Sequence, residues 1–300
     1  MNKILVVLNP MAGGKQGLQK KIEALSPRIV VRLTSTVGDA EIIAQQAMRQ
    51  GYSTVVAAGG DGTVNEVVNG IGGFSATLGI LPVGTMNVFA TELSLPLNNL
   101  SQAWRVIEAG QVRTIDLPKA NDSYFVQLAG VGLDAEVVRN TSSDSKKILG
   151  PMSYLISLAQ IVARTPPLLQ IDCGSGVRRE GCFTLVGNGR FYGGPFSLFR
   201  QAVLDDGLLD VLVFKNQSHW DVLRYMQAIL FGNHTDLRDV EYFQSNQLTI
   251  SSNGKDIPVE LDGEVCGILP YQFGFAKQKL KVLVPWSVQR YSETRSFPGR

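Results

Sequence analysis

Residues 57–70 have the sequence AAGGDGTVNEVVNG, in which three glycines follow an apolar run and precede a helical pattern. Glycine allows tight backbone turns and leaves backbone N–H groups open to an anion. Thr63 and Glu66 have the spacing of a capping box, which predicts that a helix starts here with its positive end at the glycines. The stretch therefore predicts a phosphate-binding loop, as opposed to a turn that merely joins a strand to a helix.

Asp61 lies within this loop, at the place where a phosphate would be bound. A carboxylate beside phosphates usually indicates a divalent cation between them. Because the removal of an exposed carboxylate leaves no buried cavity, Asp61 is expected to serve chemistry more than folding.

Two further loops repeat this design. Residues 81–90, LPVGTMNVFA, follow an apolar strand and open a helix, so Thr85 and Asn87 are expected at the same edge of the sheet. Residues 9–15, NPMAGGK, follow the first apolar run. Three such loops at one sheet edge predict a nucleotide site. An ordinary Walker A site is excluded, because the residues around Lys15 do not match its pattern.

The first 118 residues alternate apolar strands with helical stripes, which predicts a parallel sheet covered on both faces. The expected strands are 4–8, 54–58, 77–83 and 112–117, and the expected helices are 39–50, 64–71 and 101–109.

Beyond Pro118, strands follow one another with few helices, which predicts an antiparallel sandwich. The expected strands are 124–128, 169–173, 182–186, 208–214, 247–251, 259–261 and 280–284, with helices at 153–163 and 218–231. The predicted fold class is thus an N-terminal α/β nucleotide-binding domain, 1–118, and a C-terminal β-sandwich domain, 119–285. A return of the last strand, or of residues 286–300, to the first domain is an option.

Composition limits the function. A length of 300 residues favours two domains, and a net charge of +2 argues against a non-specific nucleic-acid binder. Three cysteines without C-x-x-C spacing indicate a reducing compartment. The longest apolar stretch, 151–163, is too short to span a bilayer. These features predict a cytoplasmic protein, with peripheral association at the inner membrane face as an option.

Residues 130–135, GVGLDA, match a dinucleotide fingerprint. The match is weak evidence for a dinucleotide site, because no second strand with an acidic end follows it.

Eight ordered motifs give the chain a stronger resemblance. It resembles bacterial members of the diacylglycerol kinase catalytic-domain family, lipid kinases related to sphingosine and ceramide kinases and more distantly to NAD kinase and phosphofructokinase. The motifs are NPMAG at 9–13, TVGDA at 36–40, GGDGTVNEV at 59–67, PVGTMN at 82–87, GVGLDA at 130–135, NGRFYGG at 188–194, DDGLLDV at 205–211 and LDGE at 261–264.

The resemblance implies that the protein uses ATP and Mg²⁺. It assigns ATP contacts to Asn9, Pro10, Met11, Ala12, Gly13, Thr36, Gly59, Gly60, Asp61, Gly62, Thr63, Val64, Asn65, Glu66 and Thr85. It assigns the metal to the Asp206 carboxylate and the carbonyl groups of Val203 and Leu208.

The resemblance also implies that Glu264 is the general base that accepts the proton of a lipid hydroxyl, with Asp61 as a second catalytic carboxylate. A simpler interpretation of Glu264 stays open, because Asp262-Gly263 is a hairpin-turn pair and the glutamate would then only begin a strand. Val88 departs from the family, which usually has an aspartate there.

The most consistent hypothesis is ATP-dependent phosphorylation of a lipid hydroxyl, with a lipid substrate at a membrane surface and a homodimer as a further option. An NAD kinase and a non-catalytic nucleotide or lipid sensor remain alternatives. The radiolabelled phosphorylation of diacylglycerol, sphingosine or NAD would separate the three hypotheses.

Overall fold

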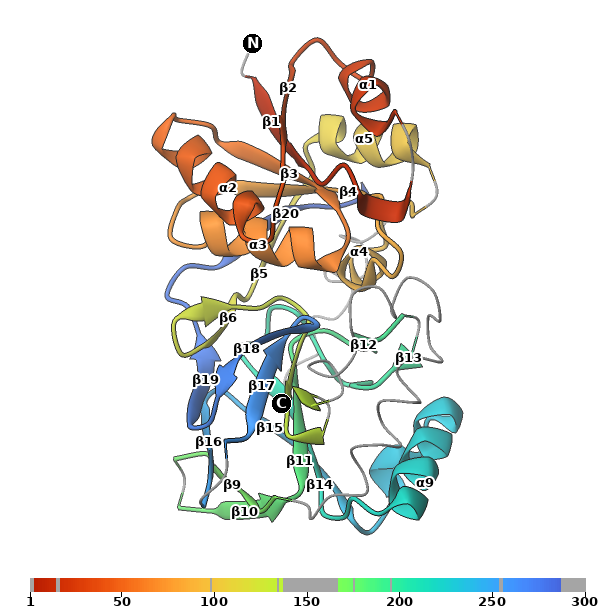
Figure 1. Ribbon diagram of the computed structural model, residues 1–300, viewed down its shortest axis with the longest axis vertical. Coiled ribbons are helices and arrows are strands. Elements are labelled where there is room, and N and C mark those ends of the chain that lie inside the picture. The colour runs from red at the N-terminus through yellow and green to blue at the C-terminus, as the bar shows by residue number, and fades with distance from the viewer. Residues whose placement is uncertain are drawn as a thin grey trace, which may run out of the picture. The chain divides into compact units, whose positions relative to one another are not determined.

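The computed structural model describes residues 3–14, 17–97, 99–133, 135–136, 167–174, 176–194, 196–253 and 256–286 (Figure 1). These residues form two compact units. The first contains the described residues up to Leu117 and from Ala276 onward, with Gly193 and Gly194. The second contains the described residues from Pro118 to Tyr192 and from Phe196 to Phe275. The helix predicted at 153–163 lies outside the described residues, and so does the predicted return of 286–300 beyond Trp286.

The first unit contains one six-stranded sheet with the order β2-β1-β3-β4-β20-β5. All neighbouring strands are parallel except β20 and β5, which are antiparallel. The strands are β1 (Ile4–Leu8), β2 (Ile29–Leu33), β3 (Thr54–Gly59), β4 (Thr77–Pro82), β5 (Val112–Ile115) and β20 (Leu280–Leu283).

Helices cover both faces of this sheet (Figure 1), which explains why its central strands are apolar throughout. Helices α1 and α5 bury Ile22, Trp104 and Ile107 against residues of β1, β3 and β4. Helices α2 and α3 pack on each other. The helices are α1 (Leu18–Glu23), α2 (Asp39–Arg49), α3 (Asp61–Ile71), α4 (Val88–Glu92) and α5 (Leu100–Ala109), with the 3₁₀ turn η1 (Ala12–Gly14). None of the helices among the described residues is long and apolar enough to cross a membrane.

The last strand returns to the first unit. The expected domain boundary after residue 285 assigned the strand 280–284 to the second domain, with its return to the first as an option, and Leu280–Leu283 lies between β4 and β5 in the first sheet. The last strand of the sandwich, β19 (Tyr271–Phe275), and the strand β20 of the first sheet both show alternation of buried and exposed residues. Periodicity therefore identifies the strand but not the sheet to which it belongs.

The second unit is a sandwich of two antiparallel sheets, as predicted. One sheet has the order β10-β9-β16-β19-β6-β7, and the other has the order β15-β14-β11-β8-β17-β18. Strands β12 (Phe191–Tyr192) and β13 (Phe196–Ser197) form a separate two-stranded antiparallel sheet. The sheet strands are β6 (Pro118–Ala120), β7 (Ser123–Tyr124), β8 (Leu128–Val131), β9 (Leu169–Asp172), β10 (Arg178–Gly181), β11 (Phe183–Gly187), β14 (Leu209–Phe214), β15 (Val240–Ser245), β16 (Leu248–Ser252), β17 (Pro258–Leu261), β18 (Glu264–Ile268) and β19 (Tyr271–Phe275).

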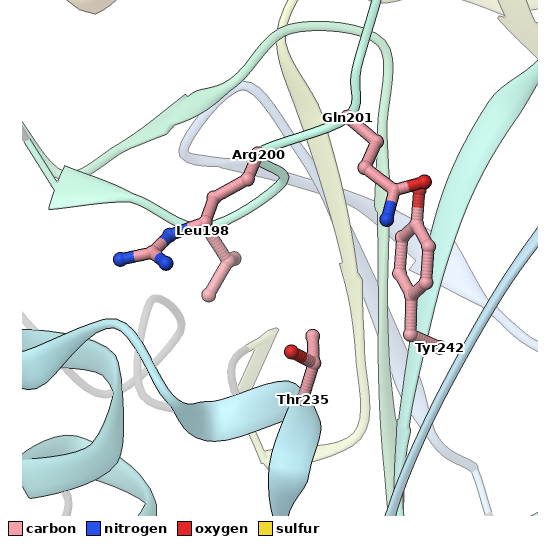
Figure 2. A pocket seen from close by; sticks show the side chains of 5 residues that line it. All are labelled: Leu198, Arg200, Gln201, Thr235 and Tyr242. Carbon is pink, nitrogen blue, oxygen red and sulfur yellow. The ribbon is translucent and has the colours of Figure 1, made fainter.

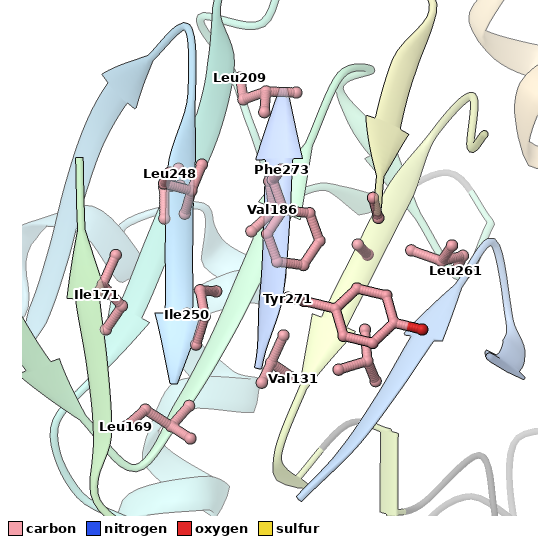
Figure 3. Packing of buried hydrophobic residues seen from close by; sticks show 14 of the residues in the cluster. Val131, Leu169, Ile171, Val186, Leu209, Leu248, Ile250, Leu261, Tyr271 and Phe273 are labelled. Atoms are coloured by element: carbon pink, nitrogen blue, oxygen red, sulfur yellow. The ribbon is translucent and has the colours of Figure 1, made fainter. Parts of the chain in front are cut away.

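The main core of this unit lies between the two sheets (Figure 3). Ile171, Ile250 and Phe273 enter it from one sheet, and Val186 and Leu261 from the other. Alternate residues of each strand face this core, as expected for packed sheets.

A second cluster covers the opposite face of the β14-containing sheet. Helix α9 (His219–Phe231) packs its Tyr225 ring against Phe183 of β11 and Phe214 of β14, with ring centroids 6.1 and 4.9 Å away. Strands β11 and β14 are therefore buried on both faces, which explains their unbroken apolar runs.

Helix α9 begins with a capping box, which confirms the predicted helix at 218–231. Ser218 Oγ accepts a hydrogen bond from the Asp221 N–H at 3.2 Å, and Asp221 Oδ2 accepts one from the Ser218 N–H at 3.1 Å. The helix ends at Gly232, whose φ is 71°.

We predict that Ser218→Ala lowers the free energy of unfolding by about 1 kcal/mol, because an N–H group of the first turn loses its acceptor. Urea denaturation of the purified chain measures the change. The matched control is Ser101→Ala, an exposed serine inside α5, whose N-cap is Asn99. Equal stability loss in both variants would contradict the capping role of Ser218.

Candidate active site

The strand order brings the predicted nucleotide loops to one edge of the first sheet. Strand β1 lies between β2 and β3, so the chain moves to one side of β1 after the first strand and to the other side after the second. Ligands of open α/β sheets bind at such a switch point, outside the carboxyl ends of the strands. The loops that begin at Asn9, Thr34, Gly60 and Val83 all leave the sheet at this edge.

Two of these loops touch through their backbones. The N–H groups of Val83 and Gly84 both donate to the Gly59 carbonyl, at 3.2 and 3.1 Å. A Cβ atom on Gly84 would collide with Gly60 Cα, and one on Gly60 would lie 3.4 Å from Gly84 Cα. The approach therefore requires glycine at position 84 and leaves little room at position 60.

Asn87 holds the second of these loops closed. Its φ is 50°, and its side chain is buried. Asn87 Nδ2 donates to the Gly84 carbonyl at 2.9 Å, and Oδ1 accepts from the Gly84 N–H at 3.1 Å. Thr85 is exposed at the tip of the loop.

Asp61 does not occupy the exposed loop position that the sequence suggested. It is the first residue of α3 and is partly buried, and its Oδ1 accepts a hydrogen bond from the Phe89 N–H at 3.2 Å. Burial raises the pKa of its carboxyl, while backbone hydrogen bonds from Val88 and Phe89 act in the opposite direction. Asp61 thus caps α4, a partner that lies 28 residues away in sequence.

The capping box predicted from Thr63 and Glu66 is wrong. Helix α3 starts three residues earlier, at Asp61, and its N-cap Gly60 makes no side-chain cap. Thr63 is buried, whereas Glu66 Oε2 accepts from the Ala40 N–H of α2 at 2.9 Å. Tertiary packing of α3 against α2 gives Glu66 a different backbone partner from the one that the local pattern suggested.

Side chains also shape the two loops at the other end of the edge. Asp39 Oδ2 accepts from the N–H groups of Ser35 and Thr36, at 2.7 and 2.8 Å, and these bonds lower the pKa of the Asp39 carboxyl. Asn9 Oδ1 accepts from the Met11 N–H at 3.0 Å, and the Asn9 N–H donates to the Ala58 carbonyl at 3.0 Å. The loops after β1 and β2 are thus shaped by side-chain hydrogen bonds within each loop, and the bond between Asn9 and Ala58 holds the first loop to β3.

The predicted ATP contacts divide by exposure. Ala12, Gly59, Thr63 and Val64 are buried, so they are oriented for packing and offer mainly backbone to a ligand. The remaining predicted contacts are exposed or partly buried: Asn9, Pro10, Met11, Gly13, Thr36, Gly60, Asp61, Gly62, Asn65, Glu66 and Thr85.

In the second unit, Asp262 and Gly263 form the predicted two-residue turn, with φ values of 49° and 90°. Glu264 begins β18, pairs with Leu261 and is partly buried. The turn pattern is therefore confirmed. A glutamate that directly follows a hairpin turn can begin a strand and also serve as a base, so both interpretations of Glu264 are compatible with this turn.

The Asp262 carboxylate does more than form a turn. It accepts hydrogen bonds from the N–H groups of Val126, Gln127 and Leu128, at 2.8, 2.9 and 3.0 Å. These residues interrupt the strand predicted at 124–128, which the structure divides into β7 and β8. Asp262 replaces the missing ladder partners of this segment and so ties the Glu264 hairpin to β8.

The predicted metal residues lie in the turn before β14. Asp206 is exposed, and its Oδ1 accepts from the Leu208 N–H at 3.0 Å, while Val203 and Leu208 are partly buried. Among the described residues, no three His, Cys, Asp or Glu side chains converge as a metal site. A cation here would depend on one carboxylate, backbone carbonyl groups and water, a set that suits Mg²⁺.

Asp210 lies just beyond this turn and is fully buried. It accepts hydrogen bonds from the Tyr242 hydroxyl and from Gln244 Nε2, the latter at 3.3 Å. Burial raises the pKa of Asp210 to about 6, and the negative charge of Asp206 adds to the increase. The segment therefore concentrates negative charge that a bound cation would relieve.

The raised pKa of Asp210 predicts a pH effect on stability. Its ordinary value is 3.8, so between pH 4 and 6 the folded state binds more protons than the unfolded state. The contribution of this group is present at low pH and is lost as the pH rises through about 6. Relative to Asp210→Asn, the native chain should lose about 1–3 kcal/mol between pH 4 and 7.

Urea denaturation of both proteins in chelator, over this pH range, measures the effect. Because other groups titrate equally in the two proteins, the difference between their curves isolates Asp210. Parallel curves would contradict the raised pKa.

Comparisons with known proteins agree with this architecture. Residues 3–120 match the family model "Diacylglycerol kinase catalytic domain", and residues 127–284 match "YegS C-terminal NAD kinase beta sandwich-like domain". The chain is 30% identical over 296 residues to a diacylglycerol kinase of Bacillus subtilis, covering 95% of this chain and 97% of the relative. It is 31% identical over 290 residues to a diacylglycerol kinase of Staphylococcus aureus, covering 93% and 91%.

Solved structures show the same fold. A crystal structure of a diacylglycerol kinase from Bacillus anthracis has a TM-score of 0.78 at 27% identity, covering 96% of this chain and 98% of that one. An NAD kinase from Archaeoglobus fulgidus, solved with ATP, has a TM-score of 0.56 at 11% identity over 99% of this chain and 100% of that one, and shares the fold alone. The family models and the full-length relatives together show that this chain belongs to the diacylglycerol kinase family.

Proposed function

We propose that this protein transfers the γ-phosphoryl group of ATP to the hydroxyl group of a diacylglycerol-like lipid. The observation that carries the proposal is full-length similarity to diacylglycerol kinases combined with a glycine-rich loop at the switch point of the first sheet. Such a lipid resides in bilayers, so we propose that the acceptor is reached at a membrane surface.

The first unit is suited to bind the phosphates of ATP. Helix α3 begins at Asp61, and its N-cap Gly60 provides no side-chain cap, so backbone N–H groups of its first turn are available to an anion. The contact between Gly60 and Gly84 brings the loop of Thr85 beside the loop of Asp61. We assign ATP binding to the predicted residues of the four loops, with the buried members acting through their backbone.

Asp61 has a positioning role in this proposal as well as its predicted catalytic one. Its carboxylate holds the N-terminus of α4, where Val88 replaces the aspartate that is usual in the family. The backbone N–H of Val88 helps to stabilise the Asp61 carboxylate, and this contact does not depend on the side chain at position 88.

We assign Mg²⁺ to the Asp206 carboxylate with the carbonyl groups of Val203 and Leu208. The concentration of negative charge at Asp206 and Asp210 supports this assignment. A bound Mg²⁺ would supply charge neutralisation.

We assign the role of general base to Glu264. A carboxylate that accepts the hydroxyl proton makes the acceptor oxygen a better nucleophile toward the γ-phosphorus. Asp262 holds the hairpin that presents this residue through three backbone hydrogen bonds.

Incubation of the protein with radiolabelled ATP and dioleoylglycerol, sphingosine or NAD tests the proposal. Label transferred to dioleoylglycerol is the expected result. Label on NAD would support the alternative activity instead, and label on none of the three acceptors would favour a non-catalytic binding protein.

We predict that Glu264→Gln reduces lipid turnover by about 10²-fold or more, because glutamine keeps the size of the side chain but cannot accept the proton. ATP affinity, measured by calorimetry, should stay unchanged. Glu180→Gln provides the control, since Glu180 is an exposed glutamate on the edge strand β10. Full activity of Glu264→Gln would show that the residue merely begins β18.

We also predict that Mg²⁺ raises the melting temperature, on the order of a few degrees, through binding to the folded state. The increase should disappear in Asp206→Asn and persist in Asp122→Asn, which alters an exposed acid beside Lys119. Scanning calorimetry with Mg²⁺ and with chelator measures the shift. An undiminished shift in Asp206→Asn would assign the ion to another carboxylate.

A further inference from the structure

Glu260 is a buried acidic residue that the proposed mechanism does not use. It belongs to β17, whose residues are all buried, and only 1% of its surface is exposed. Burial of a carboxylate is costly unless hydrogen bonds compensate for the lost water, and buried acids are frequent at functional sites. Glu260 precedes the candidate base Glu264 by four residues, so its burial needs an explanation.

The other buried acid in the described part of the second unit, Asp210, has partners on the neighbouring strand β15. The Tyr242 hydroxyl and Gln244 Nε2 donate to its carboxylate. Tyr242 also lines a small cavity, together with Leu198, Arg200, Gln201 and Thr235 of the 3₁₀ turn η2 (His234–Asp236) (Figure 2). Asp210 thus joins two strands away from the Glu264 hairpin.

Glu260 instead binds the turn that presents Glu264. Its Oε2 atom accepts a hydrogen bond from the Gly263 N–H at 2.7 Å. Because Cα atoms joined by a peptide bond are about 3.8 Å apart, this oxygen lies within about 8 Å of the Glu264 Cα atom. Asp262 binds the segment before β8, so the two carboxylates hold the turn through different contacts.

The hydrogen bond accounts for the place of the Glu260 side chain but not for its charge. A glutamine at this position would also offer an oxygen to the Gly263 N–H, and its burial would cost less than that of a carboxylate. A negative charge fixed beside a second carboxyl group disfavours the ionised form of that group. The charge of Glu260 is therefore suited to change the basicity of Glu264.

Cys266 shows that the carboxylates of this hairpin act on one small region. It lies in β18 at a bulge that shifts the pairing with β17, and its thiol donates to the Glu264 carbonyl at 3.4 Å. Burial of the sulfur raises the pKa of the thiol to about 11, and the negative charges of Glu264, Glu260 and Asp262 add to the increase. The electrostatic potential at the backbone of Glu264 is thus negative.

The strands packed against β18 contribute one further titratable group in the described part of the second unit. Strand β18 lies at the edge of its sheet, and β8, on the other side of β17, has no titratable side chain. From the facing sheet, the Tyr271 hydroxyl donates to the Cys266 carbonyl at 3.3 Å. Burial raises the pKa of this hydroxyl, so it stays neutral and does not offset the carboxylates.

We propose that Glu260 is a positioning residue for Glu264, because its carboxylate anchors the turn at Gly263 and fixes a negative charge beside the base. The charge makes Glu264 a stronger base for the hydroxyl proton of the acceptor. This proton passes to Glu264 as the acceptor oxygen bonds to the γ-phosphorus, and ADP leaves with the bridging oxygen. The proposal deepens the proposed function and rests on it, since Glu264 is the base in both.

The pH dependence of kcat with dioleoylglycerol as acceptor tests the proposal. In Glu260→Gln, the acid limb should move to lower pH by about half a unit or more, and kcat at neutral pH should fall by about 3–10-fold, because the base becomes weaker. Glu260→Ala also loses the hydrogen bond, so kcat should fall further while the limb stays where it is in Glu260→Gln. The KM for ATP should be unchanged in both variants.

A merely structural role of Glu260 would lower the amount of folded enzyme without moving the acid limb. The matched control is Glu180→Gln, which alters an exposed glutamate of β10 and should leave the limb in place. Far-ultraviolet circular dichroism verifies that each variant is folded. An acid limb at its native position in Glu260→Gln would overturn the proposal.

Alkylation of Cys266 by iodoacetamide is a second measurement, which needs no kinase activity. Because the thiolate is the reactive form, native Cys266 at about pH 8.5 should react about 10-fold or more slowly than a cysteine in a short peptide. In Glu260→Gln the reaction should be about twofold or more faster, since one of three negative charges is removed. Mass spectrometry of the peptide that contains Cys266 follows both rates.

The alkylation rates also separate this proposal from the proposed function. If the native chain phosphorylates none of the acceptors, the kinase assignment fails, and the rates alone decide whether the charge of Glu260 acts on the hairpin. A native Cys266 that reacts as fast as the peptide, or equal rates in the native chain and in Glu260→Gln, would then overturn the proposal.

Discussion

The candidate nucleotide edge depends on the contact between Gly60 and Gly84. The two loops that contain these glycines leave adjacent parallel strands, and their backbones can meet because no side chain stands between them. This contact places the start of α3 beside the loop that leads into α4. Asp61 then reaches the Phe89 N–H, and Asn87 closes the neighbouring turn. A larger residue at position 84 would separate both loops, so the geometry of the edge is a property of the backbone more than of its side chains.

Carboxylates hold the remaining loops in place. Asp61, Glu66 and Asp262 each accept hydrogen bonds from backbone N–H groups of a different segment, and Asp39 accepts them from its own loop. Each carboxylate thus serves as the acceptor for N–H groups that find no acceptor within a helix or a sheet. Leaving such N–H groups buried without an acceptor would cost stability. The acidic residues of the GGDGT and LDGE motifs therefore support the loops around them, whatever part they take in chemistry. A variant of such a residue has to be tested for folding and for turnover separately.

Local patterns predicted much of this fold. The strand at 4–8, the helix at 218–231 and the Asp262-Gly263 turn depend on neighbours in sequence, and the structure has them at those positions. Contacts between distant segments were not predictable in this way. The partner of Asp61 lies 28 residues away and that of Glu66 lies 26 residues away, so Asp61 was expected at an exposed loop position and Glu66 in a local capping box. The short elements β2 and α1 were missed because one is a partly exposed edge strand and the other has six residues.

The position of β20 has a consequence for the order in which the protein can form. This strand joins β4 to β5 in the first sheet, yet it is made more than 160 residues after β5. During synthesis the sheet of the first unit can be completed only after nearly the whole sequence has been translated. Until then, the edge of β4 that pairs with β20 has no partner strand. Loop closure over such a separation is slow, and unpaired strand edges favour aggregation. The emerging chain would therefore gain from a chaperone that covers this edge until β20 arrives.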